Sequence, residues 1–175
     1  MFYRESVVSV NPKTRQWLFW LAALMAGILV IYLPGLHNEL VFDDARLGDA
    51  VFGQYGGFAS LKQRLLSYGS FVWVDAVFGD GWWKQRIVNV ALHFGVAASL
   101  LLLFRSLAVQ VRWPEEVAAG EGFASSSDAA VFVGVAVFAF NPVAVYAVAY
   151  LIQRSILMAT LFVVLALLRK PVKIA

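Results

Sequence analysis

The sequence predicts an all-α integral membrane protein with about four transmembrane helices. Hydrophobic residues make up 61% of the 175 residues and charged residues only 14%, whereas soluble domains carry roughly 25% charged residues. Uncharged apolar runs of about 20 residues, the length that crosses a bilayer core, recur along the chain. A soluble domain of this composition would leave large apolar patches exposed to water. The composition therefore favours a membrane protein.

The first predicted span covers residues 17–36 and follows a polar segment, residues 1–16, that we assign to the cytoplasm. Pro34 and Gly35 should end this helix, because proline lacks a backbone donor and glycine permits a turn. Residues 37–85 then form a predicted outer loop that holds most of the acidic residues. Leucine and aromatic residues recur there at helical spacing, so we expect short amphipathic helices on the membrane surface.

The remaining predicted spans cover residues 86–105, 128–141 and 154–169, which completes a membrane domain over residues 17–175. The second span contains Asn89 and His93. Their spacing of one helical turn places both side chains on one face of that helix.

Basic residues flank these spans on the side that the positive-inside rule assigns to the cytoplasm: Lys13, Arg15, Arg105, Arg112, Arg169, Lys170 and Lys173. Lys84 and Arg86 lie on the opposite side and go against the rule. We therefore predict a multi-pass protein of a bacterial inner membrane, with the first loop facing the periplasm or the outside. No stripe of basic residues alternates with stacking aromatics, so no nucleic-acid partner is expected. The absence of cysteine excludes disulfides and thiolate metal sites.

Two adjacent carboxylates, Asp43 and Asp44, follow the first predicted span. In the structural interpretation they belong to a turn or a helix N-terminus, where aspartate is favoured. In the chemical interpretation they act together at the membrane surface, one as a general base and the other as an orienting group or a ligand of a divalent cation. The residues alone leave both interpretations open.

Three segments resemble the N-terminal part of a GT-C-type membrane glycosyltransferase in their order and spacing. They are FDD after the first span, QRIVNVALHFGVAASLLLLF as the second span, and FAFNPVAVYAVAYLIQRSILMATLFVVLAL near the end of the chain. The resemblance extends over residues 33–168 and is nearest to the transmembrane-and-tetratricopeptide-repeat branch and its bacterial relatives. It implies transfer of a sugar from a polyprenyl-phosphate-sugar donor to a hydroxyl acceptor on the outer face.

The resemblance also implies roles for five residues. Asp43 and Asp44 match the family's acidic pair, which implies catalysis and a divalent cation as cofactor. Arg154 matches a basic residue that would bind the lipid phosphate through charge-assisted hydrogen bonds. Asn89 and His93 match a motif of the second span and would contact substrate. These three also have structural interpretations, as a helix-end anchor for Arg154 and as interhelical hydrogen-bonding groups for the other two.

The sequence departs from the family pattern in three respects. It lacks the Arg-Pro pair expected before the second span. Asn141-Pro142 stands where His-Pro is common, and Val145-Tyr146 stands where a glutamate is common. The chain also provides about four spans, whereas an active site for a lipid-linked sugar needs more walls to enclose its donor.

Three hypotheses remain. We favour the N-terminal module of such a glycosyltransferase, inactive without further spans or a partner membrane protein. The first alternative is a non-catalytic small membrane subunit that packs against a larger membrane protein complex. The second is an unrelated small bundle from a channel or transporter. It is the weakest, because His93 is the one ionisable residue away from the ends of the predicted spans that could mark an ion path.

Overall fold

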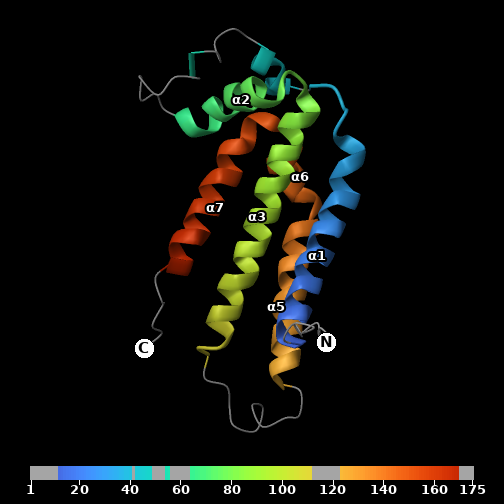
Figure 1. Cartoon of the computed structure of the whole chain (residues 1–175), viewed down its shortest axis with the longest axis vertical. Helices are drawn as coiled ribbons and strands as arrows, with labels where there is room; N and C mark the ends of the chain where they lie inside the picture. The colour runs from blue at the N-terminus through green and yellow to red at the C-terminus, as the bar shows by residue number, and fades with distance from the viewer. Residues whose placement is uncertain (1–11, 41, 49–53, 56–63, 112–122, 170–175) are drawn as a thin grey trace, which may run out of the picture.

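The computed structural model describes residues 12–40, 42–48, 54–55, 64–111 and 123–169, and helices without any strand make up this part of the chain. The long helices α1 (Pro12–Tyr32), α3 (Trp82–Ala108), α5 (Phe123–Phe140) and α7 (Arg154–Arg169) run along the longest axis. Helix α2 (Leu65–Phe78) lies across one end of them (Figure 1). We call this the α2 end. The start of α1 and the end of α7 both lie away from it.

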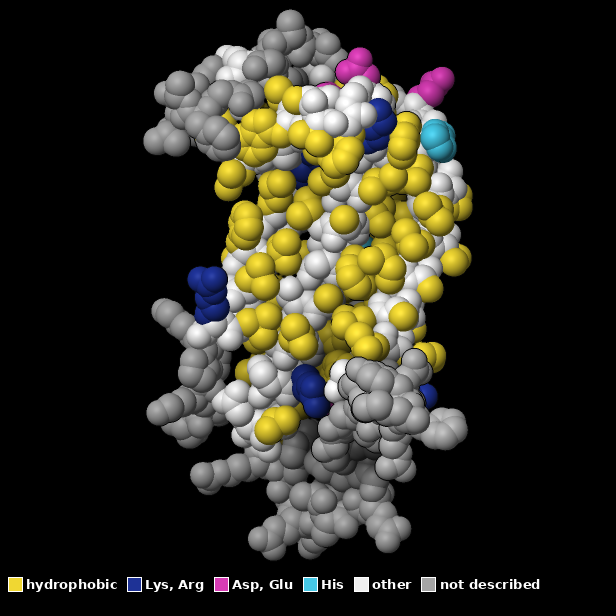
Figure 2. Space-filling model, viewed as in Figure 1, with side chains coloured by type: hydrophobic (Ala, Val, Ile, Leu, Met, Phe, Trp, Pro, Cys, Tyr) yellow, Lys and Arg dark blue, Asp and Glu magenta, His cyan; other side chains and the backbone are white. Residues whose placement is uncertain are grey.

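Three segments are long and apolar enough to cross a membrane, namely Thr14–Gly35, Trp82–Ala108 and Leu151–Arg169. A fourth segment qualifies if Ser127–Phe140 and Pro142–Val148, which meet at a bend of 48°, are counted together as one span. Hydrophobic side chains cover the middle of the face seen in Figure 2, and the visible carboxylates lie at the α2 end. The predicted all-α class is confirmed for the described residues, whereas the number of crossings stays a prediction.

Several helix boundaries differ from the predicted ones: α3 extends to Ala108 and α5 begins at Phe123, and two further helix starts have a clear local cause. Helix α1 begins at Pro12 rather than at residue 17, because proline suits the first turn of a helix, where its missing N–H costs no hydrogen bond. Helix α3 begins at Trp82 rather than at residue 86. It follows Gly81, whose φ of 139° is readily adopted only by glycine. Pro34 lies, as expected, at the end of the first helix, in the short 3-10 helix η1 (Leu33–Gly35).

Helix α2 lies in the segment where short helices were expected, and the face that it buries within the bundle consists mainly of small residues. Ser67, Gly69, Ser70 and Phe71 are buried, while Leu66 is exposed. A Cβ atom added to Gly69 would lie 2.9 Å from the backbone oxygen of Tyr55, so glycine allows this preceding segment to approach α2 closely. Through this face α2 contacts the ends of α3 and α7.

Helix α3 is central and contacts α1, α5 and α7. The main core forms around it from buried apolar side chains: Leu24, Ile28, Tyr32, Val90, Ala97, Leu101, Val135, Ala139, Val148 and Leu157. A smaller cluster of Leu47, Phe71 and Leu151 lies at the α2 end. The smaller cluster lies at the same end of the bundle as the candidate site.

Candidate functional site

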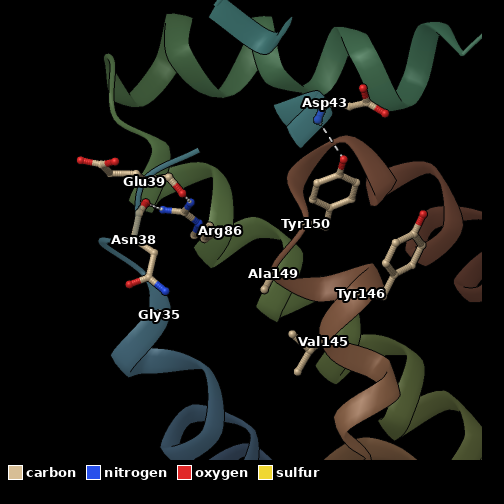
Figure 3. A pocket seen from close by; sticks show the side chains of 9 residues that line it. All are labelled: Gly35, Asn38, Glu39, Asp43, Arg86, Val145, Tyr146, Ala149 and Tyr150. Carbon is tan, nitrogen blue, oxygen red and sulfur yellow. Dashed lines mark hydrogen bonds between the residues drawn. The ribbon is translucent and has the colours of Figure 1, made fainter. Parts of the chain in front are cut away.

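A pocket of about 570 Å³ opens at the α2 end, between the segment that follows α1 and the segment from helix α6 (Val145–Val148) to Tyr150. We call it the polar chamber. The stacked rings of Tyr146 and Tyr150, with centroids 5.6 Å apart, form one wall. Asn38, Glu39 and Arg86 lie opposite (Figure 3). The remaining lining residues are Gly35, Asp43, Val145 and Ala149.

A smaller cavity of about 150 Å³, the apolar chamber, adjoins the polar chamber and shares part of its lining with it. The shared residues are Gly35, Asn38, Arg86, Val145 and Ala149. The apolar chamber then extends between Ile31 and Tyr32 on one side and Val148 on the other. The Tyr32 hydroxyl is buried and has no hydrogen-bond partner among the described residues. The carboxylates of Glu39 and Asp43 line the polar chamber alone, whereas the exposed lining of both chambers is mostly apolar.

Arg86 borders both chambers and is only 5% exposed. Its Nη1 donates to the carbonyl oxygen of Leu36, at 2.8 Å, and to that of Asn38, while Nη2 donates to the carbonyl oxygen of Glu39, at 3.0 Å. These bonds hold the segment that leaves the first span against α3. Within the described part of the chain, no carboxylate lies within 4.0 Å of the guanidinium.

The two predicted acidic residues lie in different environments. Asp44 is 1% exposed, and its two oxygens each accept a 2.9 Å hydrogen bond, from the backbone N–H groups of Leu151 and Ile152. It therefore caps the short helix η5 (Leu151–Gln153). Asp43 is exposed and borders the polar chamber. Its backbone N–H donates to the Tyr150 hydroxyl at 2.9 Å.

This arrangement does not fit the divalent cation implied by the resemblance. Both oxygens of Asp44 are already occupied by backbone donors, and the Asp43 carboxylate is turned away from Tyr150 (Figure 3). In addition, the described residues contain no group of three or more His, Asp or Glu side chains placed to hold a metal ion. We therefore assign no step to a metal.

Arg154 lies between α2, α3 and α7 and is 0% exposed. Its Nε donates to Asn89 Oδ1 at 2.7 Å and its Nη1 to Ser70 Oγ at 2.8 Å. Its Nη2 donates to the carbonyl oxygen of Gln85 at 2.9 Å and to Gln85 Oε1 at 2.8 Å. The guanidinium also lies 3.8 Å from the Phe71 ring centroid. We call this arrangement the Arg154 cage.

The cage is extended by three further bonds, one of them from Gln85 Nε2 to the carbonyl oxygen of Phe71 at 3.0 Å. Gln85 Nε2 donates to Asp75 Oδ1 at 2.7 Å, and Asn89 Nδ2 donates to the carbonyl oxygen of Val148 at 3.0 Å. The Asp75 carboxylate is thus linked to Arg154 only through the Gln85 side chain. The predicted residues Arg154 and Asn89 are indeed brought together, but neither lines the pocket.

His93 lies deeper, between α1 and α5, and is 1% exposed. Its Nε2 is 2.9 Å from the carbonyl oxygen of Ala139, and its ring contacts those of Tyr32 and Phe138. This position matches the interhelical interpretation of the residue. It does not bring His93 into either chamber.

Sequence reasoning missed most of the residues that line the polar chamber. Asn38, Glu39 and Tyr150 follow no local pattern that would have identified them. Two signals were present: Arg86 is a basic residue that goes against the positive-inside rule, and Tyr146 lies where the resemblance led us to expect a glutamate. No protein-family model, curated protein or solved structure matches the chain.

Proposed function

We propose that the chain is the membrane module of a GT-C-type glycosyltransferase that uses a polyprenyl-phosphate-sugar donor. The observation that supports this function best is the pair of adjoining, mostly apolar chambers, which share the cationic side chain of Arg86 and of which only the polar chamber also carries carboxylates. An amphiphile such as a lipid-linked sugar would place its sugar in the polar chamber and the start of its chain in the apolar one. Ile31 and Val145 line the apolar chamber and are also exposed on the surface of the bundle. The polyprenyl chain could therefore pass between them from the chamber into the surrounding lipid.

In this proposal Asp43 is the catalytic base. Its carboxylate removes the proton of an acceptor hydroxyl, whose oxygen forms a bond to the anomeric carbon of the sugar. The bond between that carbon and the phosphate oxygen breaks, and polyprenyl phosphate leaves with the electron pair. Asp44 instead positions η5 and the neighbouring Tyr150.

The proposal includes four membrane crossings, with α5 and α6 together as the third, in a bacterial inner membrane. The α2 end then faces the periplasm or the outside, where the lipid-linked sugar would be used. The acceptor would be held by a further membrane protein or by additional spans, because the described residues build only one side of an enclosed site.

The test is sugar transfer in membranes that contain the full chain and its natural partners. Radiolabelled polyprenyl-phosphate-sugar is added, and label is counted in the protein and glycan fractions. We expect Asp43→Asn to reduce transfer by roughly 100-fold or more, the usual contribution of a general base. Asp80→Asn is the matched control, since Asp80 is an exposed acid in the turn between α2 and α3. Full transfer by Asp43→Asn would disprove the assignment.

One observation favours a second candidate, the non-catalytic membrane subunit. Asp44, Asn89 and Arg154, which the resemblance associates with chemistry, are all buried and hydrogen-bonded within the chain. A subunit that packs against a larger complex would need these bonds for folding and would need no reactive group. The subunit function predicts that neither Asp43→Asn nor Asp80→Asn changes the activity of the complex.

A further inference from the structure

We propose that Arg86 binds the phosphate of the lipid-linked donor at the junction of the two chambers. This inference rests on the proposed function and adds a binding residue to it. Arg86 is the one cationic side chain among the described residues that line the chambers, and it lines both of them. In a lipid-linked sugar the phosphate is the group between the sugar and the chain. Its place is therefore at the junction.

The guanidinium has the hydrogen-bonding capacity that this role needs. Arginine carries five N–H donors, and the contacts with the carbonyl oxygens of Leu36, Asn38 and Glu39 use three of them. Two donors are left for phosphate oxygens, the number that a two-point contact requires. The buried Asp44 carboxylate attracts the guanidinium from beyond 4.0 Å, so among the described residues no ion pair uses the two remaining donors, which can bind an anion.

The acidic residues of the polar chamber leave room for an anion there. Glu39 and Asp43 both line it, but Figure 3 shows their carboxylates directed away from the Arg86 guanidinium, on opposite sides of the pocket. The apolar chamber holds about 150 Å³, which corresponds to only a few water molecules of roughly 30 Å³ each. It can therefore take a segment of one lipid chain, which favours a polyprenyl phosphate over a two-chain phospholipid.

Arg154, the residue that the resemblance associates with the lipid phosphate, has no such capacity in this structure. Its four hydrogen bonds to Asn89, Ser70 and Gln85 use at least four of its donors. It is 0% exposed and lines neither chamber. The phosphate contact is therefore assigned to Arg86 in place of Arg154.

The experiment measures binding of polyprenyl phosphate and of the phosphate-free polyprenol by native mass spectrometry. The full chain is held in a polyoxyethylene detergent, which carries neither phosphate nor sugar. We expect the wild type to prefer polyprenyl phosphate by about tenfold or more, as for hydrogen bonds to a charged group. Arg86→Gln should remove this preference and still bind polyprenol. Lys84→Gln is the matched control: Lys84 lies on the same helix end and also donates to backbone carbonyls, those of Phe78 and Gly79, but lies outside both chambers.

Several results would overturn the proposal. A wild type without preference for the phosphate does so before any variant is made, which keeps the test valid if Arg86→Gln does not fold. Equal loss of both ligands in Arg86→Gln would mean that Arg86 only supports the fold. Equal competition by phosphatidylglycerol or by inorganic phosphate would assign the site to a membrane phospholipid or a free anion. Because no sugar transfer is measured, the phosphate contact can hold even where the transferase function fails.

Discussion

The Arg154 cage leads to a prediction about folding rather than binding. We expect Arg154→Met to destabilise the protein strongly, although methionine fits an apolar interior. The substitution leaves the buried acceptors of Asn89, Ser70 and Gln85 without the donor they contact in the native protein. It also removes the hydrogen bonds by which the guanidinium joins α7 to α2 and α3.

The magnitude follows from these contacts. Each buried acceptor left without a donor costs about 1–3 kcal/mol, but methionine also removes the cost of burying a charge. Because four acceptors lose their donor, the net loss should lie near the lower end of the sum, at about 4 kcal/mol. Arg154→Lys should be no better. Lysine keeps the charge, but its three donors share one nitrogen. They cannot reach the acceptors on several helices that the planar guanidinium contacts.

The assay is reversible unfolding of the full chain by sodium dodecyl sulfate in mixed micelles, followed by far-ultraviolet circular dichroism. Arg169→Met, at the exposed far end of the same helix, is the control and should change the unfolding free energy by no more than about 0.5 kcal/mol. If the unfolding free energy of Arg154→Met equals that of Arg169→Met and of the wild type, the cage does not stabilise the fold. Loss of polyprenyl phosphate binding in such a stable variant would return the phosphate contact to Arg154.

Two further predictions concern stability. Asp44→Asn should lower the free energy of unfolding by about 1–3 kcal/mol. The NH₂ group of asparagine would face one of the two backbone N–H groups that now donate to the carboxylate. Asp43→Asn, at an exposed site, should unfold like the wild type, and equal unfolding of both variants would contradict the capping role. Gly27→Ala should lose about 1–3 kcal/mol, because the added Cβ would lie 2.4 Å from the Phe140 ring between α1 and α5. Gly134→Ala meets no atom within 4 Å and should instead gain about 0.5–1 kcal/mol through helix propensity. Thermal unfolding in detergent compares this glycine pair, and a stable Gly27→Ala would refute the close packing of these helices.

The helices could be predicted from the sequence because their signal is local. An uncharged run of sufficient length predicts a span wherever its neighbours lie. The face that α2 buries could not be predicted in this way. Ser67 and Ser70 are buried because they meet the ends of α3 and α7, and Ser70 accepts a hydrogen bond from Arg154, which lies 84 residues further along the chain.

The candidate site was predictable only in part for the same reason. The adjacent carboxylates drew attention as a pair, yet the structure separates their roles. Asp44 caps η5 over a sequence separation of 107 residues, and no local pattern indicates that this helix needs its cap there. Arg154 and Asn89 were identified through a resemblance, and their contact with each other is long-range. The partner Gln85 carries no sequence signal of its own.

The buried polar bonds are concentrated at the end of the bundle that carries the pocket. Asp44 fixes η5, Arg86 fixes the segment after η1, and Asn89 fixes the end of α6. Each of these segments borders a chamber or leads into its lining. At the opposite end, the described polar contacts include the half-buried 3.7 Å ion pair of Arg105 with Asp128.

This distribution has a consequence for ligand binding. Hydrogen bonds in a poorly solvated site are strong and directional, so the walls of the chambers keep their positions before any ligand enters. A ligand then loses little affinity to the ordering of loops. As a result, a substitution in the Asp44 cap or the Arg154 cage should lower both the free energy of unfolding and the affinity for the ligand. The Asp43 carboxylate takes part in none of these buried bonds, only in an exposed 3.8 Å ion pair with Arg46 that contributes little stability, so its substitution can separate chemistry from folding.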